Sequence, residues 1–213
     1  MKHFRTLLLA CSLYLLFAAG CSHNSDDFVV EELRSRYNTD FTVVNTYNGN
    51  YACISRDYPN AVFRATMNGK TVSDNYASKV VLARMAESLK ENMNFVDNDY
   101  EVEVYSLIDS LDVTNPNTSV DEYITAHPTM TYCVYVYVVP NGSVLDYAPY
   151  IQTMFRDYPN IKADIKLYTV ADSQMSAVRN YITHFDKHYD DFKEMLSDAN
   201  VVGISYDNGT FSY

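Results

Sequence analysis

The segment from Tyr132 to Val139 (Tyr-Cys-Val-Tyr-Val-Tyr-Val-Val) restricts the fold of this 213-residue chain more than any other. Apart from one cysteine, every residue in it is β-branched or aromatic, so both faces of the strand that it forms are apolar. Such a strand is stable inside a sheet whose two faces are covered, and it invites aggregation when exposed. The sequence therefore predicts a sheet with this strand in its interior.

Further strand-like runs occur before and after this segment, and several are joined by Asn-Gly pairs. Asn-Gly favours the positive φ angles of a tight turn, so Asn48-Gly49, Asn68-Gly69 and Asn208-Gly209 each predict a hairpin. The chain is therefore expected to contain an antiparallel meander near its beginning and a hairpin near its end. The expected strands cover residues 41–47, 51–55, 61–67, 100–107, 132–139, 163–170, 201–206 and 210–213.

Two long amphipathic helices separate these strands, and the first is capped by Ser73 or Asp74. Shorter helices are expected over 28–37 and 145–156. This mixture predicts an α+β fold with an antiparallel sheet and helices packed on one of its faces. The apolar stripes of the long helices are formed by Ser78, Val81, Leu82, Met85, Leu89 and Met93, and by Met175, Val178, Ile182, Phe185, Tyr189, Phe192 and Leu196.

The pentapeptide Arg-Asp-Tyr-Pro-Asn occurs twice, at 56–60 and at 156–160, and each copy leads into an expected strand and then a long helix. This order suggests the internal duplication of a strand-helix-strand unit, with chance in a Tyr- and Asp-rich chain as the alternative. The halves would cover 28–113 and 120–213, joined by the loop 114–119, or they would form one continuous domain. The pentapeptide itself predicts a turn, and a pair of binding loops is the sharper alternative.

The first twenty residues have the pattern of a bacterial lipoprotein signal peptide. A cationic start is followed by the apolar run from Leu7 to Ala19, which is too short for a permanent membrane span. It ends in Ala18-Ala19-Gly20-Cys21, which resembles a lipobox, so we expect a lipid on Cys21 and a polar tether over 21–27. The expected location is the cell membrane or the outer membrane, on the extracytoplasmic side. An ordinary secretory signal is the alternative.

The charge balance argues against nucleic acid as a partner. Cleavage before Cys21 would remove Lys2 and Arg5 but no acidic residue, so the formal net charge of −11 would become −13. An acidic surface of this kind repels phosphate backbones and anionic lipid headgroups. The expected partners are therefore the membrane, through the lipid, and an envelope protein or a small ligand.

Cys53 and Cys133 would remain after export, each within an expected strand. An extracytoplasmic location permits a disulfide between them, and two buried thiols are the alternative. The sequence leaves both open, because it does not show whether the two strands are neighbours.

Two groups of side chains have the spacing of metal ligands. His184, His188 and Asp191 follow one another at steps of four and three on the second long helix, where they could hold a divalent cation or form a solvated face. Four carboxylates alternate along the strand after the first long helix, so they share one face and predict either a Ca²⁺ site or a solvent-facing strand edge. These carboxylates belong to Asp97, Asp99, Glu101 and Glu103.

No motif for nucleophilic catalysis or for nucleotide binding was found, and the chain has only six glycines. We therefore expect no cofactor and a non-enzymatic binding domain. An envelope hydrolase or metal-dependent enzyme is one alternative, and it requires His184, His188 or a carboxylate pair to converge in a pocket. A small solute-binding protein is the other, favoured by a ligand-sized cleft between the halves and excluded by one fused core.

The first half also resembles a loose group of small lipoproteins and secreted proteins of low-GC Gram-positive bacteria. The resemblance covers about residues 28–95, and it implies an anchored, extracytoplasmic protein. Because that group has no established activity, it implies no catalytic residue. The matching segments are Glu32-Leu33, Tyr37, Phe41-Thr42-Val43-Val44, Tyr58-Pro59-Asn60-Ala61-Val62-Phe63-Arg64 and Ser73-Asp74-Asn75-Tyr76.

Overall fold

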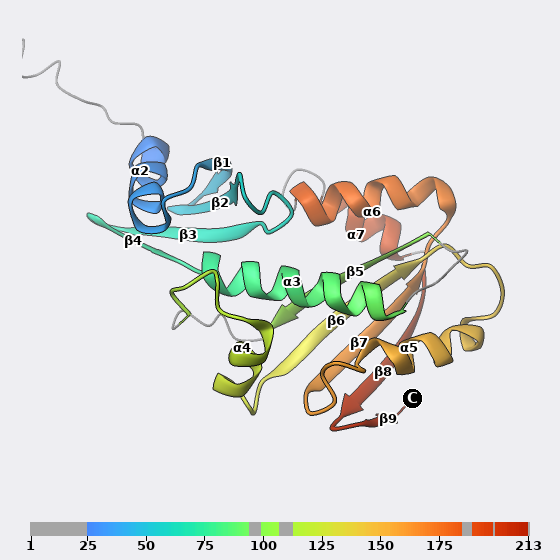
Figure 1. Ribbon diagram of the computed structural model, residues 1–213. Coiled ribbons are helices and arrows are strands. Elements are labelled where there is room, and N and C mark those ends of the chain that lie inside the picture. Colours follow the sequence, from blue (N-terminus) through green and yellow to red (C-terminus); the bar gives the residue numbers. More distant parts are fainter. Residues whose placement is uncertain (1–24, 94–98, 107–112, 185–188, 198, 213) are drawn as a thin grey trace, which may run out of the picture.

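Two β-sheets lie on either side of a long helix that packs against both, and further helices cover them, as Figure 1 shows in a computed structural model. The structure describes residues 25–93, 99–106, 113–184, 189–197 and 199–212. Helices and strands are mixed as the sequence predicts, and the fold is α+β. Within the described residues, no helix is long and apolar enough to cross a membrane.

Sheet 1 is an antiparallel meander in the order β1-β2-β3-β4, and α2 (Ser25–Tyr37) covers one of its faces. Asn48 and Gly49 have φ angles of 49° and 75°, so the first predicted hairpin turn is confirmed. Val29 and Leu33 of α2 pack on the buried face with Phe41 and Phe63. The strands are β1 (Phe41–Tyr47), β2 (Asn50–Ser55), β3 (Phe63–Asn68) and β4 (Thr71–Asp74).

Sheet 2 has the order β5-β6-β7-β8-β9 and contains the apolar segment, β6, in its interior as predicted. It is mixed and not purely antiparallel, because the chain crosses from the end of β6 to the start of β7 through η1 (Val144–Tyr147) and α5 (Ala148–Met154), which makes this pair parallel. The strands are β5 (Tyr100–Ser106), β6 (Thr131–Val138), β7 (Lys162–Thr169), β8 (Asn200–Asp207) and β9 (Thr210–Ser212).

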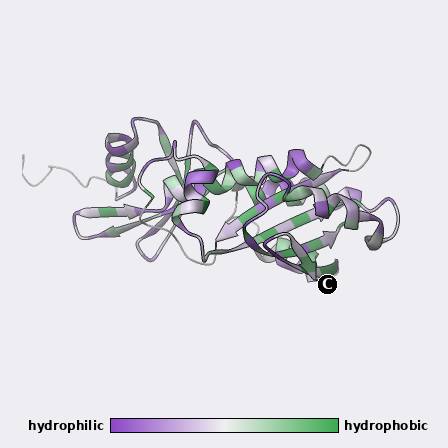
Figure 2. Ribbon diagram, turned by 60° about the horizontal axis from the view of Figure 1, so that its bottom comes forward, coloured by the Kyte–Doolittle hydropathy of each residue, from purple (hydrophilic) through white to green (hydrophobic). Residues whose placement is uncertain are grey.

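Helices cover both faces of sheet 2, whereas the sequence analysis expects them on one face. Val134 and Val136 of β6 pack toward α3 (Tyr76–Met93), α4 (Val120–Ala126) and α5. Tyr137, on the opposite face of β6, packs against α6 (Asp172–His184) and α7 (Tyr189–Ser197). The two apolar faces of β6 therefore have separate cores. In Figure 2 the strongly hydrophobic residues are concentrated on the strands of this sheet.

α3 belongs to both cores. Tyr76 and Val80 at its start pack with sheet 1, while Met85, Leu89 and Met93 pack with sheet 2. β5, which precedes the expected boundary at 114–119, pairs with β6 in sheet 2. The change from one sheet to the other therefore lies along α3, and the expected halves 28–113 and 120–213 do not correspond to the two sheets.

Two further elements differ from the sequence-based expectation. The second long helix is divided into α6 and α7, and the ring of Phe192 stacks on Tyr181 with centroids 3.7 Å apart. In one straight helix these residues would be about 16 Å apart along the axis, so the chain turns back between them. α4 was not expected. It begins with a capping box in which Ser119 and Glu122 bond each other's backbone amides.

The internal duplication is not confirmed. The pentapeptides at 56–60 and 156–160 both form turns before a strand. However, β3 folds back into β4 before α3 begins, whereas β7 continues directly to α6. β3 also lies in an antiparallel meander, and β7 is parallel to β6.

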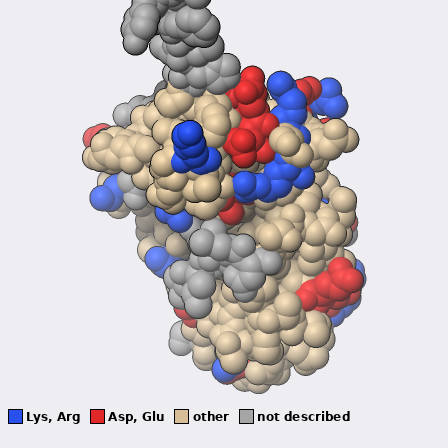
Figure 3. Space-filling model, turned by 90° about the vertical axis from the view of Figure 1, so that its left-hand side faces the viewer, with Lys and Arg blue, Asp and Glu red and all other residues tan. Residues whose placement is uncertain are grey.

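Charged side chains of both signs lie close together on the face in Figure 3. Asp40 accepts hydrogen bonds from Arg34 and Arg56, at 3.2 Å in each case, and these exposed pairs contribute little stability each. Although the chain has a net charge of −11, acidic side chains on this face are therefore interspersed with cationic ones.

Candidate functional site

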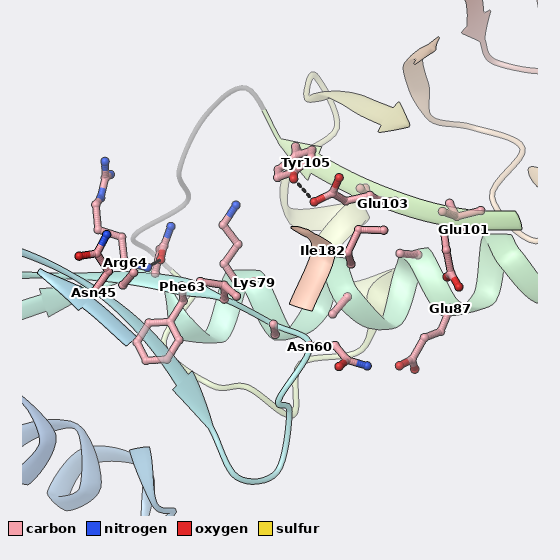
Figure 4. A pocket seen from close by; sticks show the side chains of 18 of the residues that line it. Asn45, Asn60, Phe63, Arg64, Lys79, Glu87, Glu101, Glu103, Tyr105 and Ile182 are labelled. Atoms are coloured by element: carbon pink, nitrogen blue, oxygen red, sulfur yellow. Dashed lines mark hydrogen bonds between the residues drawn. The ribbon is translucent and has the colours of Figure 1, made fainter. Parts of the chain in front are cut away.

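A cleft of about 560 Å³ lies between sheet 1 and β5, with α3 along one side (Figure 4). Sheet 1 contributes residues of β1, β2 and β3, sheet 2 contributes residues of β5, and α6 contributes Ile182. This volume falls in the range of about 300–1,000 Å³ that is usual for small-molecule sites. The cleft is therefore large enough for an organic ligand.

The wall from sheet 1 is the face that α2 does not cover, and a β-bulge at Val44 decides which side chains lie on it. Val43 pairs with Cys53, and Asn45 pairs with Ala52, so Val44 is the extra residue. In a regular strand Thr42, Val44 and Thr46 would all lie on the cleft side of sheet 1. The bulge instead places Asn45 and Tyr47 on the cleft side, as bulges near binding sites often do.

The wall from sheet 2 carries carboxylates of β5, and Glu101 is paired with two cations. Lys90 Nζ lies 2.6 Å from Glu101 Oε2, and Arg179 Nε lies 2.9 Å from Oε1. Arg179 also bonds Asp99. These contacts attach α3 and α6 to the strand and largely compensate the charge of Glu101.

Glu103 has a different environment, because its nearest polar contacts are phenols. Tyr105 donates a hydrogen bond to Oε1, and the Tyr137 hydroxyl donates to Oε2 at 3.3 Å. Burial raises the pKa of this carboxyl to about 8, although the Tyr137 hydrogen bond and the Lys79 cation partly counteract the shift. At neutral pH the cleft therefore contains a carboxyl that is largely protonated.

Aromatic rings support this carboxyl from behind. Tyr105 packs against Tyr135 with ring centroids 5.5 Å apart, and Tyr137 stacks on Tyr168 at the same distance. The Lys79 ammonium lies 5.0 Å from the centroid of the Tyr105 ring. Rings packed in this way restrict the positions of the hydroxyls that hold Glu103.

The alternating carboxylates pointed to this cleft, but their expected role was different. Asn60, at the end of the first pentapeptide copy, also lines the cleft, whereas no residue of the second copy does. Asp99, Glu101 and Glu103 are engaged by arginine, lysine and tyrosine side chains, so β5 does not present a solvent-facing acidic edge. Asp97 lies outside the described residues. In the part of the chain that the structure describes, no group of three or more His, Cys, Asp or Glu could hold a metal ion.

The expected metal ligands His184, His188 and Asp191 fall at the division between α6 and α7. His188 lies outside the described residues, and the side chains of His184 and Asp191 are likewise not described. Because the rings of Tyr181 in α6 and Phe192 in α7 stack on each other, His184 and Asp191 do not lie on one straight helix as expected.

The two cysteines are not bridged. Cys53 lies in sheet 1 and Cys133 in sheet 2, and both are free thiols. Burial raises the pKa of the Cys53 thiol to about 12, with Asp74 and Asp26 adding to the shift, so this thiol is unreactive. The expected signal peptide, the expected lipobox and Cys21 lie outside the described residues.

Most residues of the cleft carry no recognisable signal in the sequence. Asn45 depends on a bulge that no local pattern revealed, and Arg64 and Lys79 had no signal beyond their position in a strand and a helix. Glu87 lies on the flank of the first long helix, where a charged residue is expected to be solvated. Predicting a site that is formed by two sheets and one helix requires knowing how these elements pack together.

Comparisons with known proteins establish a likeness of fold. No family model matches the chain, and no curated protein matches it. The crystal structure of a DUF5037 family protein from Ruminococcus gnavus ATCC 29149 is similar, with a TM-score of 0.69 and 14% sequence identity. The similarity covers 89% of this chain and 95% of that chain, so it includes both sheets. The chain thus shares its overall fold with that protein.

Proposed function

We propose that this chain is a lipid-anchored extracytoplasmic protein that binds a small ligand in the cleft between its two sheets, without changing it chemically. The observation that carries the proposal is the cleft itself, whose volume of about 560 Å³ suits an organic ligand. Apart from Ile182, the residues that line the cleft all belong to the expected first half, so the cleft lies between the two sheets and not between the expected halves. Its size is what supports the solute-binding alternative.

The composition of the walls supports binding. Amides of Asn45 and Asn50, the aromatic ring of Tyr47 and apolar side chains such as Val104 and Ile182 line the same space. Sites for small molecules combine apolar surface with a few polar groups that set the orientation of the ligand.

The lipid anchor is proposed from the sequence at residues 1–21. Changing Cys21 to Ala should move the protein from the membrane fraction to the soluble extracytoplasmic fraction, because the acylated thiol is lost. Changing Cys53 to Ala serves as the control and should leave it on the membrane. Membrane association that survives Cys21→Ala would refute the anchor.

Glu103 favours a second candidate, an envelope hydrolase. A carboxyl that holds its proton near neutral pH is suited to act as a general acid. The two candidates differ in what happens to the ligand, which a hydrolase converts and a binding protein releases unchanged.

One experiment tests the cleft. The unlipidated full chain is incubated with a small-molecule extract of the producing cells, separated from unbound compounds and denatured, and the released compounds are identified by mass spectrometry. Wild-type protein should retain specific compounds. Ala83→Trp, on the α3 side of the cleft, should abolish their retention by filling the space.

Ala177→Trp, at an exposed position of α6, is the matched control and should retain the same compounds. Ala52→Trp fills the cleft from sheet 1. Loss of retention in both cleft variants could not then be attributed to a folding defect in one of them. Equal retention by all four proteins would overturn the proposal, and compounds recovered as cleavage products would favour the hydrolase.

A further inference from the structure

One strand of sheet 2 lines the cleft with an unbroken run of residues. Successive side chains of a strand point to opposite faces of the sheet, so a cavity on one face is lined by every second residue. This cleft is lined by all five residues from Glu101 to Tyr105. Their strand, β5, is also the end strand in the order β5-β6-β7-β8-β9. The cleft therefore runs along the outer edge of β5 and includes its backbone.

The hydrogen-bond pattern between β5 and β6 shows which backbone groups point to this edge. The Val139 N–H donates to the Asp99 carbonyl at 2.9 Å, and the register that follows is unbroken, so every second residue after Asp99 bonds β6. The N–H and C=O groups of Val102 and Val104 consequently point away from β6. Within the described residues, no hydrogen bond involves these groups. The cleft therefore contains the donors and acceptors of an open strand edge.

The helix α3 runs beside this edge over nearly the same length. Lys90 pairs with Glu101, and the Lys79 ammonium lies over the Tyr105 ring, so the helix and the strand run in opposite directions (Figure 4). The lining part of α3, from Lys79 to Lys90, rises by about 16 Å, and the lining part of β5 extends for about 14 Å. A segment of about five residues in extended conformation has this length.

The space between those two contacts is bordered by small and apolar side chains. Ala83 and Ala86 line it on α3, where their short side chains leave room for an extended backbone. Val62 and Ile182 add apolar surface from the segment before β3 and from α6. A strand added to β5 would point its side chains alternately to the two faces of the sheet. One set would lie against the alanines and the other toward α6.

From the open edge we infer that the ligand of the cleft is a polypeptide segment of about five residues, which joins sheet 2 as an extended strand beside β5. Its backbone pairs with the outward N–H and C=O groups of Val102 and Val104. These groups repeat every 7 Å or about that distance along the edge, a spacing that another extended backbone matches. The inference rests on the proposed function, since it names the ligand class of the same cleft.

The first test changes the ligand. A random library of heptapeptides, N-acetylated and C-amidated, is incubated with the unlipidated full chain, and the retained peptides are identified by mass spectrometry. One retained sequence is then synthesised with a single N-methyl group at each position in turn. Binding should weaken about tenfold or more at every second position and little at those between, because only alternate N–H groups face β5. A scan without this period of two would overturn the inference.

The second test changes the edge of the protein. Val104→Pro removes one outward N–H and places the proline ring at the edge, but it removes no hydrogen bond to β6. Retention of the blocked peptides should fall about tenfold or more, because the ligand loses a donor in a partly desolvated site. Circular dichroism measures whether the variant folds. The N-methyl scan needs no variant, so it decides the question if Val104→Pro does not fold.

Val72→Pro is the matched control. Val72 is also buried in an end strand, β4 of sheet 1, and it does not line the cleft. Its N–H points away from β3, because the Asn75 N–H donates to the Arg64 carbonyl and alternate residues of β4 bond β3. This variant should retain the peptides like the wild type. Equal retention by folded Val104→Pro and by Val72→Pro would refute the added strand.

The outcomes separate the inference from the proposed function. If Ala83→Trp abolishes retention of a non-peptide compound while the wild type retains no blocked peptide, the cleft is a binding site and the peptide is refuted. A wild-type dimer that Val104→Pro dissociates would also refute it, because the edge would then pair with a second copy of the chain. If Ala83→Trp changes nothing, the cleft itself is refuted.

Discussion

At the scale of single residues, Glu103 links the structure of the cleft to pH. Its carboxyl is held by two phenols, and burial raises its pKa from the usual value of 4.5 to about 8. Between these values the folded protein keeps a proton that the unfolded chain releases. The contribution of Glu103 to stability is therefore fully present below about pH 4.5 and is lost as the pH rises through about 8.

Glu103→Gln should remove this dependence, because an amide stays neutral at every pH. We expect the variant to match the wild type to within about 1 kcal/mol at pH 5 and to exceed its free energy of unfolding at pH 8.5 by about 4–5 kcal/mol, since the shift spans about 3.5 pKa units and each unit corresponds to about 1.4 kcal/mol. Urea unfolding followed by circular dichroism measures both. Glu91→Gln, an exposed carboxylate of α3, is the control, and a parallel change in the two variants would contradict the prediction.

The sequence pattern singled out Glu103, but it predicted a Ca²⁺ site or a solvent-facing strand edge and not a buried carboxyl. Alternation predicted that Glu101 and Glu103 share a face of one strand, and they do. Their partners come from α3, β6 and α6, namely Lys90, Tyr137 and Arg179, which lie 11 to 78 positions away from the carboxylates that they contact. Pairing over such distances depends on packing, and periodicity does not contain that information.

At the scale of elements, α4 depends on its capping box. The Ser119 hydroxyl accepts a hydrogen bond from the Glu122 amide at 3.2 Å, and the Glu122 carboxylate accepts one from the Ser119 amide at 2.9 Å. Ser119→Ala should lower the free energy of unfolding by about 0.5–2 kcal/mol. Ser176→Ala, at an exposed position inside α6, should cost nothing, and urea unfolding of both variants measures the difference.

The bulge in β1 permits a matched pair of deletions. Removing Val44 or removing Asn45 gives a regular strand of the same length, but only the first keeps Asn45 opposite Ala52 on the cleft face. We expect the Val44 deletion to retain cleft ligands in the mass-spectrometric assay. The Asn45 deletion, which puts Val44 in that place, should retain less, and equal retention would exclude Asn45 as a ligand contact.

Most helices and strands were predictable from the sequence, and the differences between prediction and structure have physical causes. Asn-Gly pairs and period-two alternation indicated the strands of sheet 1 and the final hairpin. The parallel pairing of β6 with β7 was not predicted, because the sequence indicates the helix α5 but not that it crosses from one end of the sheet to the other. The division into α6 and α7 was not predicted either, because the apolar spacing is the same on both sides of the turn. The capping box at Ser119 was a usable signal that the sequence analysis overlooked.

At the scale of the whole molecule, α3 couples the two cores. Val80 packs with sheet 1, and Leu89, nine residues later, packs with sheet 2. Leu89→Ala should cost about 2–5 kcal/mol by leaving a cavity. Because the helix is shared, hydrogen exchange should accelerate in the amides of β2 as well as β7. Unchanged exchange in β2 would show that the sheets unfold independently.

The proposed anchor would set the orientation of the molecule at the membrane. Ser25 begins α2 four positions after Cys21, and four extended residues span at most about 14 Å. α2 packs on sheet 1, so under the proposal sheet 1 lies near the lipid surface and sheet 2 lies farther out. The cleft between them would then lie within reach of envelope components close to the membrane.

The continuity of α3 along the cleft has a consequence for selectivity. Proteins that trap a solute by hinge closure change the spacing of their lobes, whereas here both walls are fastened to one uninterrupted helix of 18 residues. We therefore expect the cleft to keep a nearly constant width. Ligands would then be selected by whether they fit this width. A partner protein would recognise the bound state through the exposed surface of the ligand or through small side-chain shifts, because we expect no large conformational change on binding.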